Sequence, residues 1–289
     1  MAKKRTTAKA KHPGAGTIQV VDPRSPRAAR IDFTNTEGAE RTVEGTYIDL
    51  IRDGHNHPAQ WVCNSHADPK KNQAAFLVGR GWSATDTKRK LLCQLRIPVM
   101  AINDYPDNPY MKPRYWCSGD PPKYFSERVW TDPEVMKFVG LHNRDGERPR
   151  DGAYAPKRLA KEAPNTFFFH QATDEMDVEH WLFHPFIAWG STIGCKDGPK
   201  QLYEHGAARS SMLIGLKLLF FLGYRRVYLL GCDCDPHQHP ASEYWNTIFH
   251  LTGQIAPHFK RWGYQVFQTN PNSHLRCFEF ADFDKAIAA

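Results

Sequence analysis

The side chains with the greatest capacity for chemistry lie close together between Asp233 and His239. Their sequence, Asp-Cys-Asp-Pro-His-Gln-His, places two carboxylates directly before two imidazoles. Carboxylate oxygens are ligands that Mg²⁺ and Mn²⁺ prefer, so we predict a divalent cation at Asp233 and Asp235. An imidazole can remove a proton from an attacking hydroxyl near neutral pH, a role open to His237 and His239. The alternative is a polar loop without a ligand.

The loop Gly79-Arg80-Gly81-Trp82-Ser83 is a second candidate, because it follows an apolar run, residues 74–78, that predicts a strand. Small residues here allow backbone N–H groups and a helix N-terminus to approach a phosphate closely. The loop lacks the third glycine of the dinucleotide fingerprint, and the Gly-Lys-Ser/Thr end of a P-loop does not occur in the chain. An ordinary turn is therefore the alternative to a ligand-binding loop.

Polar groups at two further element ends extend the predicted site. Asn103 ends a predicted strand, residues 98–103, where its amide can contact a nucleotide base or sugar or simply cap a turn. Arg209, Ser210 and Ser211 open a predicted helix. A guanidinium and hydroxyls at that place suit a phosphate, although serines at a helix start also serve as caps.

A separate group of residues has the types found in tetrahedral zinc sites. His55, His57, Cys63 and His66 follow one another at short spacing in the N-terminal quarter of the chain. The spacing is not that of a standard zinc finger. We therefore favour ordinary surface and core residues over a structural zinc ion at this place.

The elements that must position these groups alternate between strand and helix. Residues 74–78, 85–95 and 98–103 predict a strand, a helix and a strand joined by a glycine turn, which is a right-handed crossover in a parallel sheet. Further predicted strands are residues 115–120, 166–170, 225–231 and 264–268, and further predicted helices are 132–138, 205–222 and 243–261. We predict an α/β fold: a Rossmann-like, doubly wound, mostly parallel sheet in three layers.

The boundaries of this fold follow from composition. We predict a disordered basic tail over residues 1–16, an irregular N-terminal segment packed on the core over 17–70, and the nucleotide-binding domain over 71–289. Short strands are expected at 17–21 and 46–51. Residues 143–164 are charged and rich in Arg, Gly and Pro, which indicates a surface excursion or a mobile lid.

Composition restricts the class of protein. The chain has 289 residues, 41% of them hydrophobic and 24% charged, which is enough for a sizeable core. Its longest apolar run, residues 212–223, is shorter than the ~20 residues that span a bilayer, and the N-terminus is not a signal peptide. Seven cysteines without regular spacing predict reduced thiols in the cytoplasm of a bacterium or phage-infected host. Five units of the net charge of +7 lie in the first twelve residues, so the tail could contact nucleic acid or only aid solubility.

The second half of the chain resembles a specific family. The run from Ser210 to Asp233 is similar to a segment of bacterial sialyltransferases, and of related phage and hydroxymethylpterin-pyrophosphokinase-like proteins. In that segment a Ser-rich turn and a helix lead into Leu-Gly-Tyr-Lys-x-Ile-Tyr-Leu-x-Gly-x-Asp. The turn Asn270-Pro271-Asn272-Ser273 also resembles their late Pro-Asn-Ser turn. The likeness covers residues 76–278 and is strongest over 205–278.

This resemblance implies roles for the residues singled out above. The Gly79 to Ser83 loop and Asn103 would hold a donor nucleotide, and the Ser210 region would hold its phosphate. In the sialyltransferases a catalytic histidine lies between the Gly-x-Asp strand and the Pro-Asn-Ser turn. The histidines of that interval are His237, His239, His250 and His258, of which we favour His239 and then His237 for their place in the loop. The family's loop usually reads Gly-Asn-Gly-Pro-Ser-Leu. In this chain Arg80 stands where the family has the asparagine.

We therefore predict a glycosyltransferase that moves a sugar from a nucleotide-sugar donor to a hydroxyl acceptor. Asp233 and Asp235 are the candidates to stabilise the positive charge that develops on the sugar. The acceptor could be a small metabolite, a glycan or a hydroxymethylated pyrimidine in phage DNA, which would have to be turned out of the duplex. One alternative is an ATP-dependent pyrophosphokinase of the hydroxymethylpterin type, with magnesium at Asp233 and Asp235. Another is a nucleic-acid-binding protein on a Rossmann-like scaffold.

Overall fold

The computed structural model describes the chain from residue 74 onward most fully. It places residues 74–103, 110–119, 129, 131–140, 163–169, 181–182, 210–222, 224–235, 242–261 and 263–288. For the strands before residue 58, the two short strands at 171–172 and 187–188, and residues 221 and 242–247, only the backbone is described. Within these residues the longest helices are too short or too polar to cross a bilayer.

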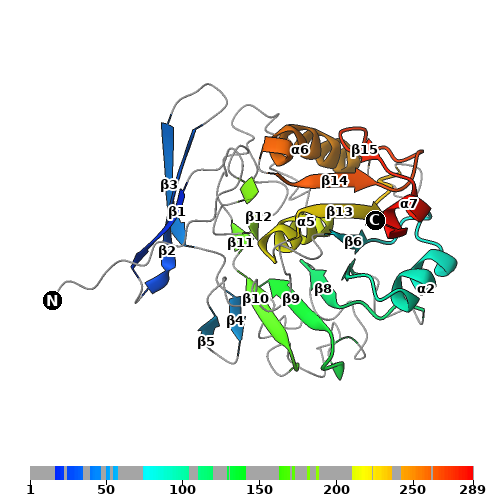
Figure 1. The fold of residues 1–289 in the computed structure, drawn as a ribbon, viewed down its shortest axis with the longest axis horizontal. Helices are drawn as coiled ribbons and strands as arrows, with labels where there is room; N and C mark the ends of the chain where they lie inside the picture. The colour runs from blue at the N-terminus through cyan, green and yellow to red at the C-terminus, as the bar shows by residue number, and fades with distance from the viewer. Residues whose placement is uncertain are drawn as a thin grey trace, which may run out of the picture.

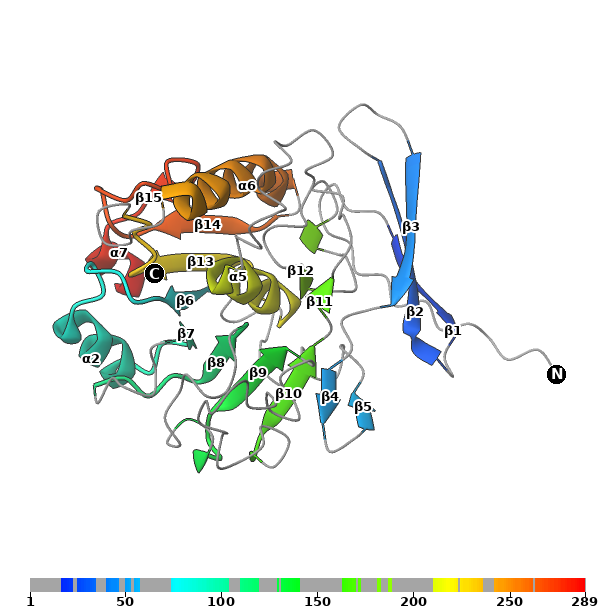
Figure 2. The same ribbon diagram turned by 180° about the vertical axis from the view of Figure 1, so that it is seen from behind.

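From residue 74 onward the described chain contains both strands and helices (Figures 1 and 2). The strands are β1 (Thr17–Asp22), β2 (Ser25–Thr34), β3 (Glu40–Thr46), β4 (Leu50–Arg52), β5 (His55–His57), β6 (Ala74–Val78), β7 (Val99–Ile102), β8 (Tyr115–Ser118), β9 (Met136–Gly140), β10 (Thr166–Phe169), β11 (Gln171–Ala172), β12 (Ile187–Ala188), β13 (Arg226–Leu230), β14 (Gln265–Gln268) and β15 (Glu279–Phe280). The helices are α2 (Asp86–Gln94), α5 (Ser211–Phe221), α6 (Ser242–Arg261) and α7 (Phe283–Ala288).

The main sheet has the strand order β15-β14-β13-β6-β7-β8-β9-β10-β4-β5. Its first eight strands are all parallel, and β4 and β5 continue it in antiparallel pairing. The central strands are almost wholly buried, as expected for a parallel sheet that is covered on both faces. The predicted Rossmann-like α/β fold is confirmed.

Two apolar cores lie on opposite faces of the sheet, which confirms the three layers. On one face α5 and α6 pack against alternate strand residues such as Leu77 and Leu229. On the other face α2 and α7 pack against the intervening residues, such as Phe76 and Tyr228. This alternation follows from the two-residue period of a strand, which sends neighbouring side chains to opposite faces.

Helix α5 is almost entirely apolar and lies in the protein interior. All residues from Ser210 to Phe220 are buried, including Lys217. The Lys217 ammonium lies 5.6 Å from the ring centroid of Trp181, and burial lowers the pKa of this lysine well below its usual value. Because such a helix has no polar face for contact with water, it is stabilised by its packing in the protein interior.

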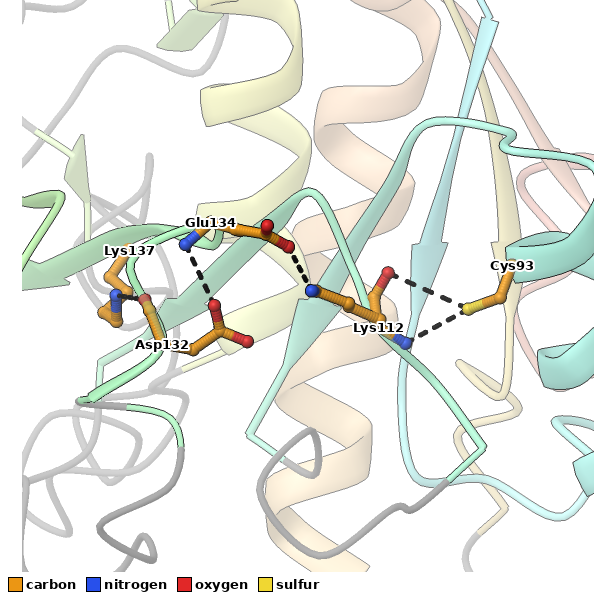
Figure 3. A network of polar contacts seen from close by, with 5 residues as sticks. All are labelled: Cys93, Lys112, Asp132, Glu134 and Lys137. Atoms are coloured by element: carbon orange, nitrogen blue, oxygen red, sulfur yellow. Dashed lines mark hydrogen bonds and ion pairs between the residues drawn. The ribbon is translucent and has the colours of Figure 1, made fainter.

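The predicted helix over residues 132–138 is wrong, because this segment contains strand β9 and the turn that precedes it. Lys137 is unusual in this strand, since a charged residue is rare in the middle of a parallel sheet. The structure accommodates it by hydrogen bonds from its ammonium to the carbonyl oxygens of Asp132 (2.5 Å), Pro164 (2.7 Å) and Val135 (3.0 Å). Figure 3 shows the contact with Asp132 beside an ion pair between Lys112 and Glu134.

The N-terminal segment contains the strands β1 to β5. Strands β1, β2 and β3 form a separate antiparallel sheet, and β4 adds to the main sheet beside β10. The strand expected at residues 17–21 is confirmed as β1. The expected tail, residues 1–16, and all but the last two residues of the excursion predicted at 143–164 lie outside the described residues.

Candidate functional site

The order of the strands locates the crevice in which a ligand is expected. The chain runs outward from β6 through β7, β8, β9 and β10, and then returns to place β13 on the other side of β6. The direction in which the chain adds strands to the sheet therefore reverses between β6 and β13. In open parallel sheets ligands bind outside the carboxyl ends of the strands at such a switch point. Here the loops that follow β6 and β13 meet there.

The glycines of the β6 loop are explained by close packing against the end of β13. The N–H of Gly79 donates to the carbonyl of Leu230 (2.8 Å), and the N–H of Gly81 donates to that of Gly231 (2.6 Å). A Cβ on Gly79 would lie 2.6 Å from the Gly231 oxygen, and one on Gly81 would lie 2.3 Å from an oxygen of Asp233. The two N–H groups are thus engaged within the protein, so a phosphate would need other donors.

Asp233 ties three segments together. Its Oδ2 accepts a hydrogen bond from the backbone N–H of Ser83 (2.9 Å), and its Oδ1 accepts bonds from the Ser83 hydroxyl (2.5 Å) and the Asn270 amide (2.9 Å). The residue is only 3% exposed. We refer to Ser83, Asp233 and Asn270 as the Asp233 cluster. It joins the loop after β6, the end of β13 and the turn after β14, which is a bracing role that the sequence did not indicate.

A second polar cluster lies one strand away, at the ends of β7 and β8. The Oδ1 of Asn103 accepts hydrogen bonds from the hydroxyls of Ser118 and Ser211, both at 3.1 Å. Asn103 has a left-handed backbone (φ 62°), a conformation that asparagine tolerates better than most residues. We refer to Asn103, Ser118 and Ser211 as the Asn103 cluster. Among the described residues both hydrogen bonds of the Asn103 side chain go to its carbonyl oxygen, so its amide hydrogens can donate to a ligand.

The start of α5 contributes to this cluster and to its own cap. Ser210 is the N-cap, and its hydroxyl accepts from the N–H of Leu213 (3.4 Å), so the cap interpretation of this serine is confirmed. Ser211, the first helical residue, instead reaches Asn103. Both serines are buried. Arg209 lies outside the described residues, so its contact with a phosphate stays a prediction.

The rim of the site carries a histidine that sequence reasoning overlooked. The Nε2 of His274 lies 4.0 Å from Oδ1 of Asp235, and its ring stacks on Phe249 of α6 with centroids 6.2 Å apart. Its backbone N–H donates to the carbonyl of Asp233 (3.1 Å). The side chain is 42% exposed, so a substrate can reach it. The available signal was its place directly after the Pro-Asn-Ser turn, which closed the interval searched.

The cysteines near the site are unsuited to nucleophilic chemistry. Burial raises the pKa of the thiols of Cys117, Cys232 and Cys234, and for the last two the nearby Asp233 carboxylate adds to the effect. A thiol must ionise before it can attack or bind a metal. These side chains therefore act as small apolar groups in the core, where two of them flank Asp233.

The other histidines and the zinc candidates predicted from the sequence do not lie together in the described structure. His237 and His239 lie outside the described residues, whereas His250 and His258 lie on α6. His55 and His57 are on β5, of which only the backbone is described, and Cys63 and His66 are outside the described residues. The part of the chain that the structure describes contains no group of three or more potential metal ligands. The roles predicted for these residues, and for the Asp233 and Asp235 pair, stay predictions.

Comparison of the chain with protein-family models, with curated proteins and with solved structures gives no match in any of the three. The chemistry of the site follows from its own residues. They offer an amide at the end of β7, a helix start beside it, and a rim histidine paired with a carboxylate. This combination can bind a phosphorylated ligand and accept a proton from a hydroxyl.

Proposed function

We propose that this protein is a glycosyltransferase that moves a sugar from a nucleotide-sugar donor to a hydroxyl acceptor. The observation that carries the proposal is the Asn103 cluster. It sits at the carboxyl ends of β7 and β8, next to the switch point and the start of α5. A polar cluster so placed suits the nucleotide part of a donor, with the phosphates directed at the helix start.

The Asp233 cluster favours glycosyl transfer over the magnesium-dependent pyrophosphokinase. Both oxygens of the Asp233 carboxylate already accept hydrogen bonds, and the residue is almost fully buried. A divalent cation there would have to compete with Ser83 and Asn270 for the carboxylate oxygens. Transfer of a sugar can proceed without a metal when protein groups stabilise the leaving phosphate, so it fits this geometry better.

In the proposed reaction the acceptor oxygen attacks the anomeric carbon of the donor sugar. The bond from that carbon to the donor phosphate breaks, and its electron pair leaves with the phosphate. Arg209 and the N-terminus of α5 would stabilise the departing phosphate. The proton of the acceptor hydroxyl passes to an imidazole. The sequence favours His239 and then His237 for this role, and His274 is the candidate among the described residues.

The acceptor is a hydroxyl on a metabolite, a glycan or a hydroxymethylated pyrimidine in DNA. For DNA the basic residues of the tail, at positions 3–11, would supply contacts with phosphates. These contacts weaken as salt rises. A loss of DNA transfer, but not of transfer to small acceptors, after deletion of residues 1–12 is the expected signature of that case.

The test is a thermal-shift panel on the full chain with CMP, UDP, GDP, ADP, ATP, and CMP- and UDP-sugars, each with EDTA, Mg²⁺ or Mn²⁺. A ligand that binds only the folded state raises the melting temperature. Stabilisation by CMP or UDP compounds that is indifferent to EDTA supports the proposal. Stabilisation by ATP with Mg²⁺ alone would favour the pyrophosphokinase, and no response to any nucleotide would favour a nucleic-acid-binding scaffold.

A further inference from the structure

Basic side chains gather at the amino edge of the parallel sheet, which is the edge opposite the candidate site. Because β6, β7, β8, β13 and β14 are parallel, the residues that begin them lie along this one edge. The register places Arg226 of β13 level with Gln265 of β14 and with Ala74 of β6. Six basic residues lie at these strand starts or in the short segments that lead into them. We refer to them as the basic edge: Arg96, Arg114, Arg225, Arg226, Lys260 and Arg261.

Carboxylates are absent from the same segments in the part of the chain that the structure describes. No aspartate or glutamate occurs in the described residues that lead into β7, β8, β13 and β14, which are 95–98, 110–114, 224–225, 260–261 and 263–264. Glu134 precedes the next strand, β9, and pairs with Lys112. Asp233 and Asp235, by contrast, follow the carboxyl end of β13. The described residues thus give the amino edge a positive charge that the site edge lacks.

Local structure explains part of this charge. Arg225 donates to two carbonyl oxygens at the end of α5, at 2.8 and 3.1 Å. Lys260 and Arg261 lie in the last turn of α6, where the helix dipole favours a cation. Arg114 and Arg226 lie at strand starts instead, where no helix end requires them. Their presence in the same row extends the charge beyond what helix capping needs.

The row of charges matches a linear polyanion. Five of the six residues are arginines, whose planar guanidinium can donate two parallel hydrogen bonds to one phosphate. Four strand intervals of about 4.8 Å separate β14 from β8, which gives the row a length of about 19 Å. A nucleic-acid duplex carries one negative charge per about 1.7 Å of its axis, so a row of this length meets several phosphates. Arg96, Arg114 and Lys260 are exposed, and the other three residues are half-buried.

We propose that the basic edge binds the phosphate backbone of a nucleic acid. DNA and RNA present the same phosphates, so the ligand is a polynucleotide backbone bound without regard to base sequence. Strands of four or five residues, about 13–17 Å long, separate this edge from the candidate site. A nucleic acid held here leaves the crevice open. The basic edge therefore keeps the protein on nucleic acid, a role that does not depend on the proposed sugar transfer.

The experiment compares the full-length chain with two triple variants that each lose three positive charges. The basic-edge variant is R96Q/R226Q/K260Q. The control variant, K90Q/R276Q/K285Q, loses three exposed cations from α2, α7 and the segment before β15. Residues 1–16 are present in all three chains, so the charges of the tail cancel in the comparison. Circular dichroism and thermal melting verify that each variant is folded.

Fluorescence anisotropy measures binding of a labelled DNA duplex of about 20 base pairs, and of the RNA duplex of the same sequence, from about 50 to 200 mM salt. Vesicles of phosphatidylserine and phosphatidylcholine, sedimented with each chain, test an anionic membrane as the alternative partner. The nucleotide thermal-shift panel is repeated on the basic-edge variant. Its response should equal that of the unaltered chain, so the proposed function is tested separately.

We expect the basic-edge variant to bind at least one duplex about 10- to 100-fold more weakly at about 0.1 M salt. The slope of log K against log salt concentration should become shallower by about 2–3, because each neutralised phosphate contributes about 0.9. The control variant should stay within about 3-fold of the unaltered chain and keep its slope. The duplex whose binding depends on the basic edge identifies DNA or RNA as the partner.

Three results would overturn the proposal. The first is an equal loss of duplex binding in the two triple variants, because net charge rather than the basic edge would then decide affinity. The second is the absence of binding of either duplex to the unaltered chain. The third is a basic edge that vesicle binding requires and duplex binding does not, which would assign this surface to a membrane.

Discussion

Ser83 donates two hydrogen bonds to the same carboxylate, that of Asp233, from its backbone N–H at 2.9 Å and from its hydroxyl at 2.5 Å. The hydroxyl also accepts from the N–H of Gly231 at 3.0 Å. A single buried side chain therefore links the loop after β6 to two positions at the end of β13, Gly231 and Asp233. The loop that precedes α2 is held by this pair of residues as well as by its glycines.

The first prediction concerns that pair. Ser83→Ala removes one hydrogen bond to a buried carboxylate and leaves the N–H of Gly231 without its acceptor, so we expect the free energy of unfolding to fall by about 2–4 kcal/mol. Urea denaturation measures it. Asp233→Asn should be comparably destabilising, and the double variant should lose less than the sum of the two. Strict additivity would contradict the linkage.

The second prediction concerns Gly81, where a Cβ would lie 2.3 Å from Oδ2 of Asp233. Gly81→Ala must push the loop away from the Asp233 cluster, so we expect a loss of about 2–4 kcal/mol. Gly253→Ala is the matched control. Gly253 lies within α6 and a Cβ there meets nothing within 4 Å, so alanine should raise the free energy of unfolding by about 0.5–1 kcal/mol. Equal effects of both substitutions in denaturation experiments would contradict the packing argument.

Sequence reasoning succeeded where local pattern and tertiary packing agree. The apolar run that became β6, the capped segment that became α2 and the glycine turn between them carry their structure in neighbouring residues, and all three are confirmed. It failed at β9, because the burial of Lys137 depends on carbonyl groups, one of them at Pro164, that no local pattern reveals. The bracing role of Asp233 was missed for the same reason, since its partners lie 150 and 37 positions away.

The third prediction concerns the pH dependence of stability near Lys137. Burial lowers the pKa of this lysine to about 8, against 10.5 ordinarily, and the Asp132 carboxylate partly opposes the shift. Between these two values the unfolded chain binds more protons than the folded one. The free energy of unfolding should therefore rise with pH across this window, by at most about 1.4 kcal/mol per pH unit from this group.

Urea denaturation at pH 8.5 and 9.5 measures that slope. Lys137→Met should lack this part of the slope and be less stable overall, because three carbonyl groups lose their donor. Lys112→Met is the control. Lys112 is an exposed lysine paired with Glu134 (Figure 3), and its replacement should leave the slope over this interval close to that of the unaltered chain. A slope independent of Lys137 would contradict the assignment.

The fourth prediction separates the structural and binding roles of Asn103. In Asn103→Asp the carboxylate can still accept from Ser118 and Ser211, and aspartate tolerates the left-handed backbone, so stability should change by less than about 1 kcal/mol. The amide hydrogens are lost and a negative charge replaces them. Nucleotide affinity in calorimetry should fall by about 10- to 100-fold. Unaltered affinity would remove Asn103 from the proposed donor site.

The fifth prediction identifies the group that takes the proton from the acceptor. If His274 has this role, His274→Gln should lower kcat by about 10²- to 10⁴-fold and leave nucleotide affinity unchanged. Asp235→Asn should have a smaller effect, because the carboxylate, 4.0 Å from Nε2, only stabilises the imidazolium. His237→Gln and His239→Gln are compared in the same initial-rate assay of sugar transfer. Full turnover by His274→Gln together with loss of turnover by His239→Gln would assign the proton to the histidine that the sequence favoured.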